Sequence, residues 1–410
     1  MSPSSALLIH ITGHDRPGVT FGLTSILARH GVRMLDIGQA VIHDALALGL
    51  LVELPDSLRA STLFTDLLLE AHRLGVQLTF SASTSAEYDA WVRAQAKRRF
   101  IVTVLGPRLE ASDIAAVGGI LSDAGLNIDR IDRLSSRVPL EPDDRTPPRF
   151  CVEFSASAPA ADSPIDEDQV RTRLAALTAP GAIDVAFQHD SIFRRNRRLV
   201  AFDMDSTLIQ GEVIDELARL AGTGDQVRAI TESAMRGELD FQESFRRRVR
   251  MLKGLPQSAL AEVIRTIPLV DGAERLVVML RKLGYRTAIL SGGFTFFGRV
   301  LQERLGIDRL HANTLDIKDG VVTGEVQPPI VDGARKAALL QEIASSEGLS
   351  LEQCVAVGDG ANDLPMLRLA GLGIAFRAKP VVRSGARQSI SSLGLDGILY
   401  LIGVRDREAG

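Results

Sequence analysis

The first 190 residues contain an internal repeat, and this repeat restricts the fold more than any other feature of the sequence. A strand-like run that ends in a glycine, ALLIHITG at Gly13, recurs 93 positions later as FIVTVLG at Gly106. Each run leads into a helical pattern that closes at another glycine, Gly31 in the first copy and Gly125 in the second, 94 positions apart. Self-similarity at a nearly fixed spacing means that one structural unit is used twice. We therefore expect two consecutive domains of the same fold.

Each copy then continues with further strand-like and helical runs, so the predicted order is β-α-β-β-α-β in both. That order predicts a four-stranded antiparallel sheet with two helices on one face, the ferredoxin-like plan. In the second copy a Pro- and Asp-rich loop, VPLEPDDRTPP at 138–148, lengthens a hairpin. A basic connector, FRRNRRL, follows the repeat and leads to the strand-like run LVAFDMD. We place the two domains at residues 1–92 and 93–190.

The remaining chain, 191–410, alternates apolar β-branched runs with helical patterns. The runs LVAFDMD, TAILSGG, CVAVGDG and LGIAF are too apolar for strands with one exposed face. Such alternation predicts a Rossmann-like parallel sheet with helices on both faces. Ligands of such sheets bind at the carboxyl ends of the strands, where this sequence places its acidic and glycine-rich segments.

Composition excludes several classes of protein. The 410 residues are 45% hydrophobic and 24% charged, as in an ordinary globular protein, and the net charge of −4 argues against nucleic-acid binding. The N-terminus lacks a basic segment before its short apolar run, and no run has the roughly 18 to 20 apolar residues that span a bilayer. We expect a cytoplasmic protein with no membrane partner, in which Cys151 and Cys354 are buried free thiols rather than a disulfide.

Two carboxylates, Asp203 and Asp205, follow the apolar run LVAF at the predicted end of a strand. Hydrolysis of a phosphate monoester needs a nucleophile and an acid together, because the uncatalysed reaction is among the slowest known. One aspartate can attack phosphorus while the other protonates the leaving oxygen and later deprotonates water. An ordinary loop with two solvated acids is the alternative.

Three later segments favour the catalytic interpretation. Ser291-Gly292-Gly293 supplies a hydroxyl and unobstructed backbone N–H groups for phosphate oxygens. Lys336 begins a helical pattern and offers a cation, and the segment GDGAND at 358–363 supplies two more carboxylates. Taken singly, these segments read as a turn, a surface lysine and a capped helix start.

In this order the four segments resemble the four motifs of the haloacid dehalogenase superfamily. The runs DMDSTLIQGEVIDELA, FQESFRRRVRMLKGLP, SGGF and VAVGDGANDLPML narrow the resemblance to the phosphoserine phosphatases, over about residues 198 to 400. The resemblance implies hydrolysis of O-phospho-L-serine, the last step of serine biosynthesis. It makes Asp203 the nucleophile and Asp205 the general acid and base.

The same resemblance implies a Mg²⁺ site and a set of substrate contacts. The metal ligands would be the carboxylates of Asp203 and Asp359 and the main-chain carbonyl of Asp205, which suits the preference of Mg²⁺ for oxygen. Ser291 and Lys336 would hold the phosphoryl oxygens, and Asp363 would orient Lys336 through an ion pair. The remaining motif residues join the site as substrate contacts or support: Gly292, Asn362 and Thr207.

The stretch from 212 to about 283 has helical apolar spacing and resembles the small helical cap of this family. An α-amino acid carries an ammonium and a carboxylate, so the cap should offer one acid and one arginine. By resemblance these are Glu212 and Arg248, with Met235 and Phe241 as an apolar wall. The alternative is that Glu212 is an acid at a helix start, Arg248 is a surface arginine, and Met235 and Phe241 belong to the core of the cap.

The loop GHDRPGV at 13–19 resembles the ligand loop of ACT domains, which are ferredoxin-like modules that bind amino acids. Asp15 and Gly18 would contact an amino-acid effector, for which we expect L-serine as feedback inhibitor. The second copy lacks Asp-Arg-Pro-Gly at this place, which suggests a packing or dimerisation role instead. ACT modules usually pair edge to edge, so the resemblance implies a homodimer.

Three functions therefore stay open from the sequence. The chain is a phosphoserine phosphatase modulated by amino acids, a phosphatase for another phosphomonoester such as phosphothreonine or a phosphoprotein, or a non-catalytic sensor with a degenerate phosphatase domain. Five chemically intact motif residues count against the sensor: Asp203, Asp205, Ser291, Lys336 and Asp359.

Overall fold

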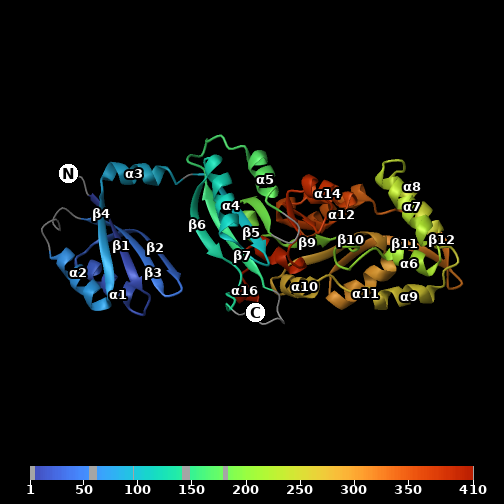
Figure 1. Cartoon of the computed structure of the whole chain (residues 1–410), viewed down its shortest axis with the longest axis horizontal. Coiled ribbons are helices and arrows are strands. Elements are labelled where there is room, and N and C mark those ends of the chain that lie inside the picture. Colours follow the sequence, from blue (N-terminus) through green and yellow to red (C-terminus); the bar gives the residue numbers. More distant parts are fainter. Residues whose placement is uncertain (1–4, 55–61, 96, 141–147, 179–182, 410) are drawn as a thin grey trace. The chain divides into compact units, whose positions relative to one another are not determined.

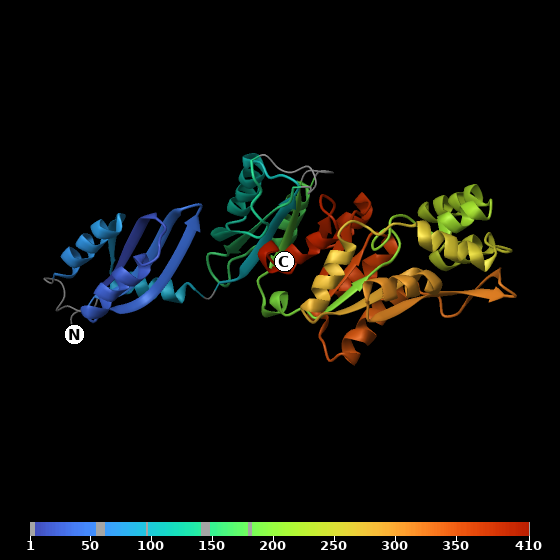
Figure 2. The same ribbon diagram turned by 90° about the horizontal axis from the view of Figure 1, so that it is seen from below.

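The computed structural model describes residues 5–54, 62–95, 97–140, 148–178 and 183–409, and leaves out the side chains of Ser5 and Met235. The chain divides into two compact units, Met1–Lys97 and Arg98–Gly410. Figures 1 and 2 show the elements of each unit. The loop at 138–148 lies mostly outside the described residues, since 141–147 are not among them.

The first unit is a four-stranded antiparallel sheet of order β2-β3-β1-β4. Its elements are β1 (Ser5–His14), α1 (Val19–Arg29), β2 (Arg33–Ile42), β3 (Ala45–Leu54), α2 (Leu63–Leu74), β4 (Val76–Ser83) and α3 (Ser85–Arg93). Buried positions alternate with less buried ones along β3, so one face of the sheet carries the core. The buried side chains of α1 and α2 pack in that core.

The second unit begins with the same fold, in the equivalent order β6-β7-β5-β8. Its elements are β5 (Arg99–Gly106), α4 (Ala111–Asp123), β6 (Asn127–Arg133), β7 (Phe150–Ser157), α5 (Glu167–Ala175) and β8 (Asp184–His189). The repeated glycines Gly31 and Gly125 follow α1 and α4 with positive φ angles of 65° and 70°. Both helices therefore end at a left-handed residue, a conformation that glycine adopts without a steric penalty. The predicted repeat of ferredoxin-like domains is confirmed.

A seven-stranded sheet forms the rest of the second unit, in the order β12-β11-β10-β9-β13-β14-β15. The strands are β9 (Leu199–Phe202), β10 (Arg286–Phe294), β11 (Arg309–Lys318), β12 (Val321–Gln327), β13 (Cys354–Gly358), β14 (Leu372–Phe376) and β15 (Gln388–Ile390). All pairs are parallel except the edge hairpin of β11 and β12. The predicted parallel sheet is confirmed.

Helices cover both faces of this sheet. The helices after β9 are α6 (Val213–Leu220), α7 (Gly224–Met235), α8 (Phe241–Arg250), α9 (Gln257–Thr266), α10 (Ala273–Lys282), α11 (Thr295–Leu305), α12 (Gly333–Ser346), α13 (Leu364–Leu369), α14 (Pro380–Gly385), α15 (Ile398–Leu401) and α16 (Asp406–Ala409). Short 3₁₀ turns complete the unit: η2 (Ile192–Arg195), η3 (Leu351–Gln353), η4 (Ala361–Asp363) and η5 (Leu395–Gly397).

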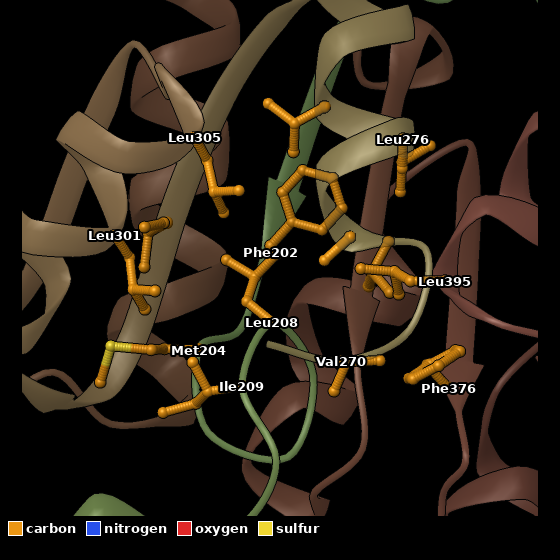
Figure 3. Close-up of a cluster of buried hydrophobic side chains, with 14 of the residues drawn as sticks. Phe202, Met204, Leu208, Ile209, Val270, Leu276, Leu301, Leu305, Phe376 and Leu395 are labelled. Atoms are coloured by element: carbon orange, nitrogen blue, oxygen red, sulfur yellow. The ribbon is translucent and has the colours of Figure 1, made fainter. Parts of the chain in front are cut away.

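The central strand β9 joins two hydrophobic cores. Val200 and Phe202 face a core that includes α10 and α11, while Leu199 and Ala201 face another that includes α12 and α13. Figure 3 shows Phe202 in the middle of the first core. Because alternate strand residues point to opposite faces, a strand that is apolar throughout must be covered on both sides.

The cap consists of α6 to α9, which Figure 2 shows as a group of helices at one end of the phosphatase domain. Helix α10 contacts β10, α11 and η5, so it belongs to the sheet layer. The cap therefore ends near α9, whereas the sequence predicts an end at about residue 283. Its helical spacing continues into α10, and spacing alone does not distinguish a cap helix from a helix on the sheet.

Both cysteines, Cys151 and Cys354, are buried and free, as predicted. Among the described residues, no helix combines the length and the apolar character needed to cross a membrane.

Candidate active site

The carboxylate of Asp203, directly after β9, is bound by a buried lysine. Lys336 Nζ lies 2.8 Å from Asp203 Oδ1 and 2.7 Å from Asp363 Oδ1. Burial alone would lower the pKa of Lys336, but the two carboxylates outweigh it and raise the pKa. The ammonium is therefore charged at neutral pH. The ion pair that the sequence predicts between Lys336 and Asp363 is present.

A cluster of acidic side chains lies beside this lysine. Carboxylate oxygens of Asp203, Asp359 and Asp363 lie within 4.8 Å of one another. Both oxygens of Asp363 are already used, because Oδ1 binds Lys336 and Oδ2 accepts the Gly360 N–H at 2.9 Å. Burial and the charges of Asp203 and Asp363 raise the pKa of Asp359 to about 8. Crowded carboxylates of this kind fit a divalent cation with oxygen ligands.

Asp205 interacts electrostatically with Asp203 of this cluster and is only 8% exposed. The Val213 N–H, at the start of the cap, donates to Asp205 Oδ1 at 3.0 Å. Burial, with the charges of Glu212 and Asp203, raises the pKa of Asp205 well above its usual value. A Cβ on Gly293 would lie 2.5 Å from Asp205 Oδ2, so only glycine leaves room for this carboxylate.

Ser291, Gly292 and Gly293 lie in the last part of β10, where its pairing with β11 is irregular, and one peptide group of this segment is held at both ends. The Gly293 N–H donates to Ser291 Oγ at 2.9 Å, and Asn313 Nδ2 donates to the Gly292 carbonyl at 2.8 Å. Asn313 is fully buried, and its Oδ1 accepts the Val331 N–H. Sequence reasoning missed Asn313, because it is one of three polar residues in the strand run HANTL and no pattern distinguishes it from the others.

Helix α8 brings the cap onto this end of β10. A Cβ on Gly292 would lie 3.3 Å from Phe241 Cζ, and the Phe241 ring stacks on Phe245. The neighbouring Gln242 Nε2 donates to Asp332 Oδ2 at 2.7 Å, which joins the cap to the start of α12. Gln242 was also missed, since a glutamine in a charged helix reads as a solvated residue. The predicted partner of Phe241, Met235, has its side chain outside the described residues.

Glu212 and Arg248 line the cap side of the site. Glu212 is exposed by area, yet the protein atoms around it and the charges of Asp203 and Asp215 raise its pKa. Burial lowers the pKa of Arg248, against the opposing charges of Glu212 and Asp215. Within the described part of the chain, the buried Arg248 Nε has no hydrogen-bond partner.

Two further predicted residues also lie here. The Thr207 hydroxyl donates a long hydrogen bond of 3.4 Å to Asp359 Oδ1. Asn362 Nδ2 would lie 3.9 Å from a Cβ on Gly292, so Asn362 is beside the two glycines of β10. The structure thus brings the motif residues of the phosphatase domain to one place at the carboxyl ends of β9, β10 and β13.

The predicted effector residues lie in the first unit. Gly18 is the N-cap of α1 with φ +97°, and it lines a hollow of about 400 Å³. The other lining residues are Pro17, Phe21, Gly22, Ser25, Ile26, Arg29, Glu70, Arg73 and Leu74. Asp15 is exposed and does not line this hollow.

Comparison with known proteins agrees with this geometry. Residues 200–368 match the model of the haloacid dehalogenase-like hydrolases, and residues 5–81 and 99–188 each match an ACT domain model. The solved structure of a haloacid dehalogenase family hydrolase from Salmonella enterica serovar Typhi superposes with a TM-score of 0.60 at 32% identity. It covers 75% of this chain and 99% of its own.

Two relatives align over nearly the whole chain. The phosphoserine phosphatase of Streptomyces coelicolor is 42% identical, over 98% of this chain and 93% of its own. The phosphoserine phosphatase SerB2 of Mycobacterium tuberculosis is 41% identical, over 98% and 94%. With a full-length match of this kind and the acidic cluster in place, the chain belongs to the phosphoserine phosphatases of the haloacid dehalogenase family that carry two ACT domains.

Proposed function

We propose that this enzyme hydrolyses O-phospho-L-serine to L-serine and phosphate with Mg²⁺, through an aspartyl-phosphate on Asp203. The single observation that carries the proposal is the buried Lys336, 2.8 Å from Asp203 Oδ1 and 2.7 Å from Asp363 Oδ1. A buried cation beside a carboxylate at a strand end is suited to receive a phosphate dianion, because it offsets the charge that would repel the nucleophile. The reaction would be the last step of serine biosynthesis.

Asp203 is suited to act as the nucleophile. Both hydrogen bonds that the described residues donate to its carboxylate, from Lys336 and from the Met204 N–H, go to Oδ1. This leaves Oδ2 to attack phosphorus. The new bond joins Oδ2 to phosphorus, the bond between phosphorus and the serine oxygen breaks, and the phosphoryl group stays on Asp203.

Asp205 is suited to act as the acid and then as the base. Its raised pKa keeps a proton on the carboxyl group where an exposed aspartate would have lost it. The Val213 N–H fixes Oδ1, so Oδ2 is the oxygen beside Gly293. That oxygen gives its proton to the departing serine oxygen. In the second half of the reaction Asp205 takes a proton from water, whose oxygen displaces Asp203 from phosphorus.

Asp203, Asp359 and the main-chain carbonyl of Asp205 would hold Mg²⁺. The fit is supported by the pKa of Asp359, near 8 without a cation, since a divalent ion would remove the repulsion that raises it. When bound, the metal neutralises charge on the phosphoryl oxygens. Asp363 is a weaker candidate, because Lys336 and the Gly360 N–H occupy both of its oxygens.

Ser291 is suited to donate a hydrogen bond to the phosphoryl group. Its oxygen already accepts the Gly293 N–H, so the hydroxyl hydrogen is available for another partner. On the cap side, Arg248 Nε has no hydrogen-bond partner among the described residues and suits the substrate carboxylate, and Glu212 suits the ammonium. These two residues favour phosphoserine over a phosphate ester that is not an amino acid.

The test is turnover of phosphoserine by the full chain with Mg²⁺, compared with Asp203→Asn. The amide keeps the size of the side chain and loses the nucleophilic charge, so turnover should be lost while the thermal unfolding midpoint stays. Acid quenching of the wild-type reaction with ³²P-labelled phosphoserine should trap a labelled protein. More than a few per cent of wild-type turnover in the variant, without deamidation, would contradict the role of Asp203.

For the first ACT domain we propose that an amino-acid effector, L-serine, binds in the hollow beside Gly18. The hollow contains Arg73 and Glu70, which suit a carboxylate and an ammonium. Asp15 is outside its lining, so we retain Gly18 and not Asp15 as the contact. A homodimer and a cytoplasmic location stay predictions from the resemblance.

A further inference from the structure

We propose that the second ACT domain anchors the linker that returns from the cap to the sheet, and that Arg149 is a positioning residue for this linker. The linker is residues 268–272, between α9 and α10. The inference rests on the proposed function in one respect: it assumes that the cap covers the substrate site. Its evidence is a continuous set of contacts from the ACT sheet to the linker.

The two ACT copies differ in how much of their sheet is buried. In the first copy the equivalent strand, β1, leaves His10 and Thr12 exposed between buried residues. In the second copy β5 is buried at every position from Phe100 to Gly106. Leu105, Cys151 and Ala186 belong to the same hydrophobic core as Phe202 of the phosphatase sheet. The second face of this ACT sheet is therefore packed against the phosphatase domain.

The loop that follows β15, residues 391–396, is bound to the ACT sheet at its beginning. Asp184 of β8 is fully buried, and its Oδ2 accepts the Ser391 N–H at 2.8 Å, the Ser392 N–H at 2.7 Å and the Ser392 hydroxyl at 2.6 Å. In β15 the Gln388 side chain pairs with both the N–H and the carbonyl of Phe187. The loop thus starts from a fixed point on the ACT domain.

The same loop is bound to the cap linker at its end. The Leu395 N–H donates to the Asp271 carbonyl at 2.7 Å. Gly272 has φ +81°, and a Cβ there would overlap Asp396 Oδ1. Figure 3 shows Leu395 and Val270, from the loop and the linker, in one cluster of buried side chains. The loop and the linker are therefore packed without room for a side chain between them.

Asp396 joins the ACT domain to the helix that the linker enters. It is 1% exposed, and its Oδ2 accepts from Arg149 Nη1 of the ACT domain and from Arg275 Nη1 of α10 at 2.8 Å. A second carboxylate repeats the arrangement: Asp406 Oδ2 accepts the Ser136 N–H of the ACT domain, and its Oδ1 lies 3.4 Å from Arg275 Nη2. Arg275, in the first turn of α10, is thus held through two acids.

The linker is also hydrogen-bonded to the segment at 208–210, which connects the sheet to the start of the cap. The Val270 N–H donates to the Leu208 carbonyl at 3.0 Å, and the Gln210 N–H donates to the Pro268 carbonyl at 3.0 Å. Both connections between the cap and the sheet therefore run side by side. Fixing residues 268–272 restricts the outgoing segment 208–210 as well.

The test is hydrogen exchange of the full chain, measured by mass spectrometry on peptides that cover 208–212 and 268–272. The variant is Arg149→Met, which removes the charge and keeps much of the side-chain length. The matched control is Arg173→Met, since Arg173 belongs to the same ACT domain and pairs with the exposed Asp123. Arg149→Lys is the second variant, for use if the methionine variant does not fold. Exchange needs no catalytic activity, so the result is independent of the proposed function.

We expect protection of 268–272 to fall about tenfold in Arg149→Met and to stay unchanged in Arg173→Met. A tenfold change corresponds to only about 1.4 kcal/mol, less than the usual cost of removing one partner from a buried ion pair. Protection of 268–272 in Arg149→Lys should lie between that in Arg149→Met and that in wild type. Loss of protection confined to 391–397, or equal loss in the control, would overturn the proposal, because Arg149 would then only attach the ACT domain.

Discussion

Asn313 and Gly292 are joined by a hydrogen bond from the asparagine amide to the glycine carbonyl, and this bond fixes the end of β10 that carries Ser291. The same peptide group is held at its other end, because the Gly293 N–H donates to Ser291 Oγ. Asn313 also accepts the Val331 N–H shortly before α12, the helix that carries Lys336. One buried amide thus sets the distance between two groups proposed to hold the phosphoryl oxygens.

We predict that Asn313→Asp lowers kcat for phosphoserine roughly tenfold to hundredfold with a smaller change in KM. The carboxylate can still accept from Val331, but it puts an oxygen opposite the Gly292 carbonyl, and a displacement of about 1 Å can cost that much rate. Lowering the pH protonates the new carboxyl group and restores a donor. The deficit relative to wild type should therefore shrink at low pH in steady-state assays.

Thr287→Val is the control for this variant. Thr287 is also fully buried in β10, and its hydroxyl donates a hydrogen bond to Asp308 Oδ2. This contact lies away from the candidate active site. Thr287→Val should lose stability without a comparable loss of kcat. An equal loss of kcat in both variants, or a deficit in Asn313→Asp that does not change with pH, would mean that Asn313 only supports the fold.

We predict that Arg248→Ala lowers kcat/KM for phosphoserine far more than kcat/KM for para-nitrophenyl phosphate, which has no carboxylate. Loss of a charge-assisted contact with a buried partner costs about 2 to 5 kcal/mol. The value of kcat/KM for phosphoserine should fall accordingly, while that for the aryl ester changes little. Equal losses for both substrates would show that Arg248 supports the cap and does not read the substrate.

We predict that Asp184→Asn becomes more stable relative to wild type as the pH rises. Burial raises the pKa of Asp184 above its ordinary 3.8, against the hydrogen bonds from Ser392 and Ser391. Between 3.8 and the raised value the folded state binds more protons than the unfolded state, so wild type loses stability as the pH increases. The asparagine does not titrate and keeps one acceptor oxygen for the two serines.

The measurement is the difference between the thermal unfolding midpoints of this variant and wild type, across roughly pH 4 to 7. The midpoint of the variant should rise relative to that of wild type as the pH increases. A difference that is constant across this range would show that Asp184 has an ordinary pKa.

The fold and the main acidic groups were predictable because their signals are local. An apolar run that ends in Asp203 or in GDGAND marks a strand and its carboxyl end together, and the glycines Gly31 and Gly125 mark two helix ends. The end of the cap was not predictable in this way. Helix α10 has the same spacing as the cap helices, and only the tertiary structure shows that it packs on the sheet.

The supporting contacts were invisible for a different reason. Asn313, Gln242 and Arg149 have partners at least 20 positions away along the chain, and each reads locally as an ordinary polar residue. Their importance depends on burial and on a partner in another element, which a single sequence does not reveal. The packing of the second ACT domain on the phosphatase sheet was not predictable either, because no pattern in the sequence marks it.

The last prediction is that L-serine lowers phosphatase activity through the hollow of the first unit, and that Arg73→Ala removes this effect. Typical coupling free energies of about 1 to 3 kcal/mol would change affinity by roughly 5- to 150-fold. Arg73 lines the hollow and pairs with Glu70, whereas Gly18→Ala would strain a residue with φ +97°. Arg93→Ala, in α3 of the same unit, is the matched control.

Inhibition by serine bound as product at the active site would imitate this effect, but it would survive in Arg73→Ala. Titration calorimetry should therefore show one serine site lost in Arg73→Ala and retained in Arg93→Ala, with kcat and KM in the absence of serine unchanged in both. If serine inhibits wild type and Arg73→Ala equally, the hollow has no part in regulation. The first ACT domain would then have to act through assembly, because neither Gly18 nor Arg73 belongs to the phosphatase site.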